Sequence, residues 1–421
     1  MSNKRTKKNR PMRYTPTVYK GLLPRNYNIL YTMYTDNEID SISRFFGSIV
    51  ASSHKRKMIH TDILKIYFGT YYKRYLGELE QLQLFDWVKT ESLYGPENKH
   101  NSFIIKPNIR FKNHEITSRI GTNTVNRVLD HRNTDKALKK ANKCLLTSFY
   151  NSPDFSVTNE YLQAGYHSAT KDGFGNRIHS IITNKESFTR SLLRFTSKQR
   201  IETGESDIEA SHPYLLTRMA NEPQTFTDKL GFEFNGVIEP FKEIPIEEQE
   251  KAHNMYYQGD FYENLIELLG GSDLERLVIN YCIQHADEEI PDTRRNMSKK
   301  AFMILVNSKN KEFKSLLEEK LPYTTDAIKK SLDYKVFHLF KEIPDNGTNN
   351  GGYLPYKNLA LVFQRTEALC VQASYTRSTS WGHLIHDSIL TTLDQTETVE
   401  ANLISSYSKV FSVPPKLKPI K

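Results

Sequence analysis

Two aspartates in this 421-residue sequence stand where a carboxylate could do chemistry. Asp207 ends a short segment and precedes small polar residues and an apolar helical run, a position that is most often a helix N-cap. Asp387 lies between the apolar stretches Leu384–Ile385 and Ile389–Leu390, which predicts a β-hairpin with an acidic turn. A carboxylate at the tip of an apolar hairpin is stable only if it finds a cation or a strong hydrogen-bond donor. The two aspartates are therefore candidate cation ligands.

A basic segment lies between the two aspartates. Pro291–Thr293 has the pattern of a helix start, and the four residues that follow at intervals of four share one stripe of that helix: Arg295, Lys299, Met303 and Asn307. Two cations one helical turn apart repel each other unless an anion lies nearby. A triphosphate is such an anion, and a solvated basic face is the alternative.

These parts fit one reaction. Phosphoryl transfer uses two carboxylates to hold two divalent ions, and cations to neutralise the triphosphate. Asp207, Asp387 and the basic helix supply both, so we expect a nucleotidyltransferase with two Mg²⁺ ions, for which Mn²⁺ can substitute. The triplet His386-Asp387-Ser388 also admits a hydrolase, although hydrolytic triads are assembled from distant positions rather than from adjacent residues.

The same segments resemble known polymerases. The sequence is similar to the single-subunit phage-type RNA polymerases and, more loosely, to the family A DNA polymerases. Asp207 with Ser211 resembles motif A, and motifs B and C have their counterparts in Arg295-xxx-Lys299-Lys300-xx-Met303-x-Leu305 and Leu384-Ile385-His386-Asp387-Ser388. Arg295 follows Asp207 by 88 residues (295 − 207), about the interval of the family. Three further stretches agree in order: Asp172–His179, Gln258–Tyr262 and the helix with Gln364-xx-Glu367-Ala368.

The resemblance implies a role for each matching residue. Asp207 and Asp387 would bind the two Mg²⁺ ions, and Lys299 would also protonate the pyrophosphate leaving group. The nucleoside triphosphate would be bound by five residues: Arg295, Lys299, Met303, Asn307 and His212. Arg177 would lie near the template or primer strand, and His386 near the primer or nascent 3′ end.

Some positions depart from the family pattern. Asn307-Ser308 stands where the RNA polymerases have Tyr-Gly, and His212 stands where the DNA polymerases carry a glutamate that blocks a 2′-hydroxyl. The choice between ribose and deoxyribose therefore stays open. The interval from Lys299 to Asp387 is 88 residues (387 − 299), which is short for a phage-type RNA polymerase and implies that the promoter-recognition insertion used there is missing.

An α+β fold would position these residues. We expect a right-hand polymerase core over 171–412, in which a palm with a small antiparallel sheet carries Asp207 and Asp387 beside helical fingers. Residues 1–37 predict a basic arm without regular structure, and 111–170 a helical, thumb-like connector. Over 38–110, helices at 41–52, 61–68 and 71–84 and strands at 85–90 and 102–106 have the order of a winged helix, with an ordinary small α+β domain as the alternative. Residues 413–421 predict an extended basic tail.

The amino-acid composition indicates what kind of partner the protein binds. Lys and Arg exceed Asp and Glu by nine (58 − 49), and a basic balance favours nucleic acid as template and as primer or nascent strand. Three widely separated cysteines disfavour a zinc site or a disulfide framework, and no apolar run approaches a membrane span or a signal peptide. We expect a cytoplasmic enzyme of a phage, plasmid or mobile element, in a bacterial or infected host cell. A primase, a template-independent terminal transferase, and a non-enzymatic DNA-binding initiator or regulator with an inactive palm are the alternatives.

Overall fold

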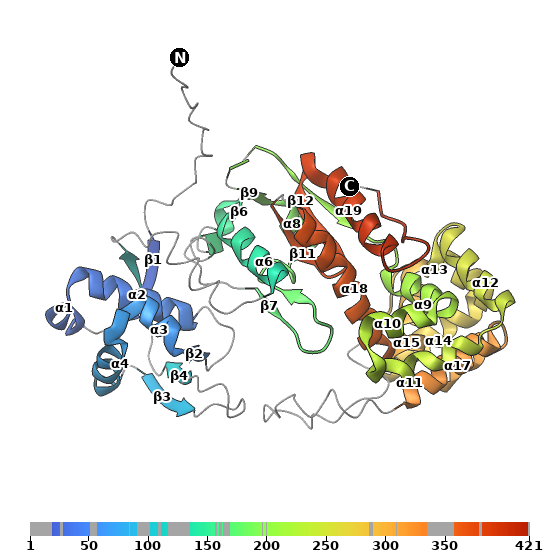
Figure 1. Ribbon diagram of the computed structural model, residues 1–421, viewed down its shortest axis with the longest axis horizontal. Coiled ribbons are helices and arrows are strands. Elements are labelled where there is room, and N and C mark those ends of the chain that lie inside the picture. Colours follow the sequence, from blue (N-terminus) through green and yellow to red (C-terminus); the bar gives the residue numbers. More distant parts are fainter. Residues whose placement is uncertain are drawn as a thin grey trace, which may run out of the picture.

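The computed structural model gives the protein an α+β fold with many helices and several small antiparallel sheets (Figure 1). It describes residues 19–25, 28–50, 57–83, 85–90, 102–107, 111–116, 135–155, 158–159, 162, 169–195, 197–198, 200–285, 289–308, 310–334, 358–378 and 381–419. None of the helices in these ranges combines the length and apolar character that crossing a membrane requires. Cys144, Cys282 and Cys370 are buried free thiols.

The N-terminal elements form a unit with its own apolar core. Its helices are α1 (Leu30–Met33), α2 (Asp36–Val50), α3 (Thr61–Phe68) and α4 (Tyr72–Gln81), and its strands are β1 (Tyr19–Pro24), β2 (Lys57–His60), β3 (Phe85–Thr90), β4 (Ser102–Pro107) and β5 (Phe111–Ile116). Glu38 accepts a hydrogen bond from the Thr35 backbone N–H (2.8 Å), which fixes the start of α2. Buried side chains of α2, α3 and α4 meet in the core, among them Phe45, Leu64 and Leu76.

The helices and hairpin expected for a winged helix all form. β4 pairs with both β3 and β2, giving a three-stranded sheet in the order β2-β4-β3. The basic connector at 94–101 lies outside the described residues. The winged-helix assignment stays a prediction.

Two predicted boundaries are wrong. Residues 19–37 do not belong to an unstructured arm, since β1, α1 and the first two residues of α2 lie within them. Residues 111–116 are a strand rather than part of a helical connector, because β5 pairs antiparallel with β1 from Tyr19↔Ile116 to Pro24↔Phe111. This pairing joins segments about ninety residues apart, and a local pattern does not reveal such a partner. Residues 1–18 lie outside the described part of the chain.

A second sheet carries both candidate aspartates. It consists of β10 (Thr203–Asp207), β12 (Ser388–Thr392) and β11 (Gly382–Ile385), in the order β10-β12-β11, and every pairing is antiparallel. Two long helices pack against it, α18 (Asn358–Arg377) and α19 (Thr396–Ser408). The predicted small antiparallel sheet is confirmed, and the tip of the β11–β12 hairpin is the predicted His386-Asp387 turn.

Smaller elements flank this sheet. They are α6 (Lys136–Leu146), β6 (Ser148–Tyr150), β7 (Thr170–Lys171), β8 (Ile178–His179), α8 (Ser187–Ser191) and β9 (Leu193–Phe195). β7 and β8 form a short hairpin whose loop is held by the Asp172 carboxylate, which accepts from the backbone N–H groups of Gly175 and Arg177. This loop presents Arg177 to the sheet.

The right-hand end of the molecule in Figure 1 is helical. It contains α9 (Ser211–Asn221), α10 (Pro223–Leu230), α11 (Asn235–Ile238), α12 (Ile246–Tyr257), α13 (Phe261–Leu269), α14 (Gly271–Gln284), α15 (Arg294–Asn307), α16 (Lys311–Glu318) and α17 (Pro322–Asp333). The predicted start of the basic helix is confirmed, because the Thr293 hydroxyl accepts from the Asn296 N–H (3.2 Å) as the N-cap of α15. Side chains of this end and of the sheet share one apolar core.

Candidate functional site

The fold brings Asp207 and Asp387 together. Asp207 is the last residue of β10 and pairs in register with Ser388, the first residue of β12. Asp387 directly precedes Ser388, so two residues 180 positions apart in sequence (387 − 207) occupy one edge of the sheet. Asp387 neighbours the residue that Asp207 opposes, and its charge acts on the Asp207 carboxyl group.

The N-cap interpretation of Asp207 is excluded. The N-cap position of α9 belongs to Ala210, which has left-handed backbone geometry (φ 49°) and no side-chain cap. Four non-glycine residues in the described ranges have positive φ, and three of them immediately precede Arg177, Ser211 and Asp387: Asn176, Ala210 and His386. Such conformations cost about 1–3 kcal/mol each and gather where a side chain must be held for function.

Burial and neighbouring carboxylates make the charged forms of both carboxyl groups unfavourable. Burial and the nearby Asp387 raise the pKa of Asp207 to about 6. Burial and the charge of Glu367 raise the pKa of Asp387 to about 7. The Oδ1 atom of Asp207 is buried without a hydrogen-bond partner. An oxygen of this kind fits a cation, which would supply the partner that Oδ1 lacks.

The donor set suits a hard divalent ion. No group of three or more His, Cys, Asp or Glu side chains in the described ranges forms a closed metal site. A site with two carboxylates must complete its coordination with water and substrate oxygens, as Mg²⁺ commonly does beside phosphates. Asp207 and Asp387 therefore fit Mg²⁺ better than a zinc-type ion.

A third carboxylate lies beneath this pair. Glu367 of α18 is fully buried and accepts from Arg177 through Nε (2.9 Å) and Nη2 (2.6 Å), and from the Ser211 hydroxyl (2.7 Å). The Nε2 atom of His212 lies 4.0 Å from Glu367 and 3.4 Å from the Arg177 guanidinium. Burial, with Arg177 adding to it, lowers the pKa of His212 to about 4. Glu367 thus joins three elements that surround the aspartates.

The basic helix α15 forms an ion pair with Asp260 through Arg295. Arg295 contacts Asp260 through Nε (2.9 Å) and Nη2 (2.8 Å), and its guanidinium lies 5.1 Å from the centroid of the Tyr262 ring. Burial raises the pKa of Tyr262 to about 12, and the charges of Arg295, Asp260 and Asp387 all act on its hydroxyl. Tyr262 therefore lies within electrostatic range of both the basic helix and the hairpin tip.

Lys299 and Met303, the next two residues of the predicted stripe, face outward. Lys299 is exposed and has no ionic partner in the described part of the chain, and Met303 is 38 % exposed. The Asn307 amide nitrogen is 3.9 Å from the Met303 sulfur, and its Oδ1 is buried without a partner. The predicted helical stripe is thus present, and its central cation is available to an anion.

His386 and Ser388 are not arranged as a hydrolase. The buried Ser388 hydroxyl donates to Glu205 (2.5 Å), which in turn binds Arg190, and not to His386. Burial, Arg177 and His179 lower the pKa of His386 to about 4, and its Nδ1 atom is buried without a partner. His386 is therefore a neutral ring at the hairpin tip, 5.5 Å from the His179 ring.

Two residues of the site are not identifiable from the sequence. The sequence pattern places Glu367 only in a helix before the hairpin, and Lys418 only in an extended tail. The tail is extended as predicted, yet it packs beside β10, and Lys418 donates to Asp207. The alternation Lys416-Leu417-Lys418 is the one local signal that could have indicated a strand.

A pH-dependent effect of metal on stability follows from the raised pKa values. A carboxyl group whose pKa is raised by folding stabilises the folded protein at low pH, where it is protonated. This contribution is lost as the pH rises above the ordinary pKa, near 3.8. The loss is complete above a pH of about 6 for Asp207 and about 7 for Asp387. Mg²⁺ should therefore raise the melting temperature near pH 8 and have almost no effect near pH 5. Thermal denaturation of the wild type beside an Asp207→Asn/Asp387→Asn variant measures this. An equal Mg²⁺ effect in both proteins would refute it.

The chain matches no model of a protein family, and no curated protein sequence matches it significantly. A functional conclusion must therefore come from the site itself.

Proposed function

We propose that this protein is a template-directed nucleotidyltransferase that extends a nucleic-acid 3′ end from nucleoside triphosphates, most like a single-subunit polymerase of a phage or mobile element. The observation that carries this proposal is the pair of carboxylates at one sheet edge, with a buried unpaired oxygen on Asp207 and raised pKa values on both. In this proposal the β10-β12-β11 sheet is the palm and α13–α15 belong to the fingers.

The reaction would join the 3′-hydroxyl oxygen to the α-phosphorus and break the bond from that phosphorus to the bridging oxygen of pyrophosphate. Asp207 and Asp387 would hold two Mg²⁺ ions, whose chemistry is to acidify the attacking hydroxyl and neutralise the leaving oxygens. The protein's own contribution is to place these carboxylates on rigid strands. Glu367 orients Arg177 beside them, where a nucleic-acid backbone would pass.

The outer stripe of α15 suits the triphosphate. Lys299 is exposed and has no ionic partner among the described residues, and Arg295 is held in a fixed orientation by Asp260 and Tyr262. A planar guanidinium held in this way favours bidentate contact with phosphate oxygens. Lys299 is also the cation that could give a proton to pyrophosphate as it leaves.

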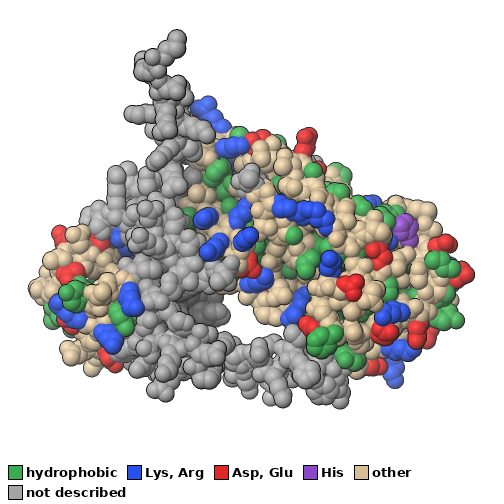
Figure 2. Space-filling view, in the orientation of Figure 1, with side chains coloured by type: hydrophobic (Ala, Val, Ile, Leu, Met, Phe, Trp, Pro, Cys, Tyr) green, Lys and Arg blue, Asp and Glu red, His purple; other side chains and the backbone are tan. Residues whose placement is uncertain are grey.

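The surface is compatible with a long polyanion. Lys and Arg side chains gather on the face over α6 and α18 (Figure 2), and α6 contributes Lys136, Lys139 and Lys143 with no acidic residue. The helices and strands of the N-terminal unit, in winged-helix order, would add a second contact with duplex DNA. We keep a cytoplasmic location as part of this proposal, in keeping with three buried free thiols.

A primer-extension assay tests the function. The purified protein is given a primed template, Mg²⁺ or Mn²⁺, and either ribonucleotides or deoxyribonucleotides, with unprimed and template-free reactions alongside. Extension that follows the template sequence supports the proposal, and the productive nucleotide set assigns the sugar. Synthesis without a primer would identify a primase, and extension without a template a terminal transferase.

The winged-helix order of the N-terminal elements specifically favours one other function, a DNA-binding initiator or regulator without catalysis. The two functions separate cleanly in the same assay. Tight duplex binding with no incorporation under any metal or nucleotide condition would replace the polymerase with this alternative.

Arg295 provides a selective test of the nucleotide site. Arg295→Ala should raise the KM for nucleoside triphosphate by about 10- to 100-fold, because a charge-assisted contact with phosphate contributes about 1.5–3 kcal/mol. Steady-state primer extension at varied nucleotide concentration measures this. The control is Arg294→Ala, since Arg294 is the adjacent arginine on the same helix and pairs with Glu275 (2.6 Å) away from the site. Equal KM values for the two variants would remove Arg295 from the nucleotide site.

A further inference from the structure

The C-terminal segment 413–418 pairs with the residues at the end of β10. Leu417 makes an antiparallel bridge with Ile208. The Glu209 N–H donates to the Lys416 carbonyl, and the Lys418 N–H donates to the Asp207 carbonyl, each at 2.9 Å. The segment therefore pairs with the chain where β10 ends, at a candidate metal ligand.

Three tyrosine hydroxyls fix this segment to the helices. Tyr214 donates to the Val413 carbonyl (2.8 Å) and Tyr257 to the Pro414 carbonyl (3.0 Å), while the Tyr256 hydroxyl accepts from the Lys416 N–H (3.1 Å). These contacts come from α9 and α12, which lie far from the C-terminus in sequence. The segment is thus anchored through its backbone and is not a loose tail.

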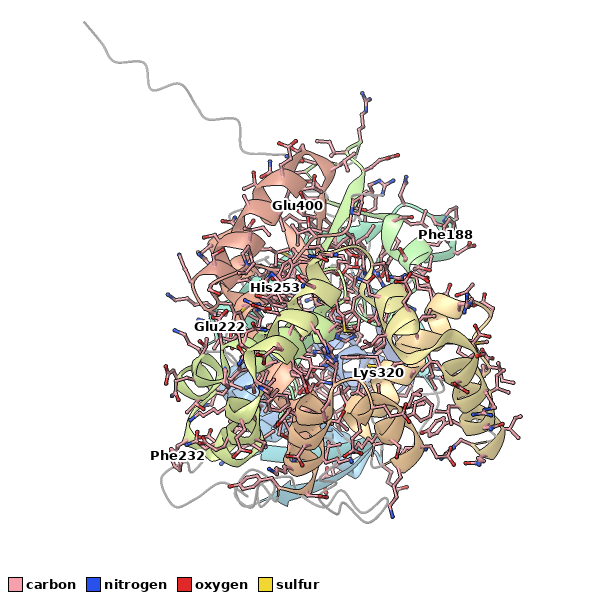
Figure 3. All side chains as sticks on the ribbon, turned by 90° about the vertical axis from the view of Figure 1, so that its right-hand side faces the viewer. Phe188, Glu222, Phe232, His253, Lys320 and Glu400 are labelled. Atoms are coloured by element: carbon pink, nitrogen blue, oxygen red, sulfur yellow. The ribbon has the colours of Figure 1, made fainter. Side chains whose placement is uncertain are left out.

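The start of the segment is anchored as well. The Glu222 carboxylate accepts from the Ser412 backbone N–H (3.0 Å) and from the buried Arg218 guanidinium (2.8 Å). Arg218 also contacts His253 (3.2 Å), and Figure 3 shows Glu222 and His253 near each other on the helical end. The backbone of residues 412–418 is consequently held at both ends of its course past Asp207.

This docking places a cation on a metal-site oxygen. The Lys418 ammonium donates to Oδ2 of Asp207, while Oδ1 of the same carboxylate is buried without a partner. The Lys418 side chain remains 45 % exposed, so its four-carbon stem can turn to solvent while the backbone stays paired. Asp387 has no ionic partner within 4 Å in the described ranges.

We propose that Lys418 is a tethered cation that occupies the metal-binding face of Asp207 in the metal-free protein and must be displaced when a divalent ion binds. This inference rests on the proposed function, because it takes Asp207 and Asp387 as the metal pair. The ammonium and the divalent ion compete for the same carboxylate oxygen, so Lys418 weakens the affinity for metal. The C-terminal segment thereby sets the metal concentration at which the site fills.

Binding of Mn²⁺ alone tests this proposal without any catalysis. Free Mn²⁺ is measured by electron paramagnetic resonance during titration of the full chain in the absence of nucleotide and nucleic acid. Lys418→Met should bind Mn²⁺ about twofold to fivefold more tightly than the wild type, the range expected for a competing, partly exposed ion pair. Lys418→Arg keeps the charge and should remain close to the wild type.

Two control variants show whether a change in Mn²⁺ affinity comes from Lys418 and from the proposed metal site. Lys409→Met removes the same charge from an exposed position at the end of α19, and should leave Mn²⁺ affinity unchanged. Asp387→Asn should weaken Mn²⁺ binding strongly in either background. If Asp387→Asn weakens binding while Lys418→Met and Lys409→Met behave alike, Lys418 does not compete and only this inference fails. If no protein binds Mn²⁺, or binding ignores Asp387, the inference fails together with the proposed function.

Discussion

Replacing Asp387 with asparagine should lower nucleotide incorporation by about 10³-fold or more and at the same time stabilise the metal-free protein. The loss of activity is expected because the second metal-binding carboxylate is gone. The gain in stability is expected because burial and Glu367 make the Asp387 charge unfavourable, with its pKa raised to about 7 from an ordinary 3.8. Near pH 8 the gain should be about 1–3 kcal/mol in the free energy of unfolding.

Lower incorporation together with higher stability distinguishes a carboxylate that serves function from one that holds the fold. Asp394→Asn is the control, because Asp394 is exposed and its bond from Lys198 lowers its pKa. That variant should retain incorporation and lose a little stability. Urea denaturation in the presence of a chelator, together with primer extension in Mg²⁺, measures both properties. An Asp387→Asn protein that is inactive and also less stable would indicate that Asp387 holds the fold rather than a metal.

The parts of the site that lie within one element were predictable from the sequence. The β11–β12 hairpin is encoded by apolar residues on both sides of His386-Asp387, and the start of α15 by Thr293. Each of these signals spans only a few residues, because turn chemistry and helix capping are local. The antiparallel sheet that carries both aspartates was expected from the family resemblance, and the structure has it.

The partners of these residues could not be predicted, because they depend on contacts between distant segments. In the sequence, nothing distinguishes Glu367 from any other glutamate in a helix. The fold buries it against Arg177, which lies 190 residues earlier (367 − 177). In the sequence, Lys418 is one of several lysines in the tail. The pairing of Leu417 with Ile208 brings it to Asp207. The pairing of β1 with β5 was missed for the same reason. Chemistry-bearing residue types are visible in a sequence, whereas the charges that tune them become visible only in the fold.

Replacing Glu367 with alanine should destabilise the protein by about 3–5 kcal/mol, the usual effect of removing one partner of a buried ion pair. Glu367 is fully buried, and its loss leaves the Arg177 guanidinium, with a side chain only 16 % exposed, without its carboxylate. Glu318→Ala is the control: it breaks a pair of similar length with Lys329 (2.6 Å) on an exposed surface and should cost about 0–1 kcal/mol. Chemical denaturation of both variants gives the comparison.

A double variant distinguishes a structural ion pair from a functional one. Arg177→Met should destabilise the protein as Glu367→Leu does, since each leaves one buried charge, and the combination should be more stable than the sum of the single effects predicts. Incorporation should nevertheless stay low in the double variant, because Arg177 is absent from the edge beside Asp207 and Asp387. Recovery of activity together with stability would mean that the pair serves only to hold α18 against the β7–β8 hairpin. Persistent inactivity in a stable protein would mean that Glu367 is buried at the site in order to aim Arg177.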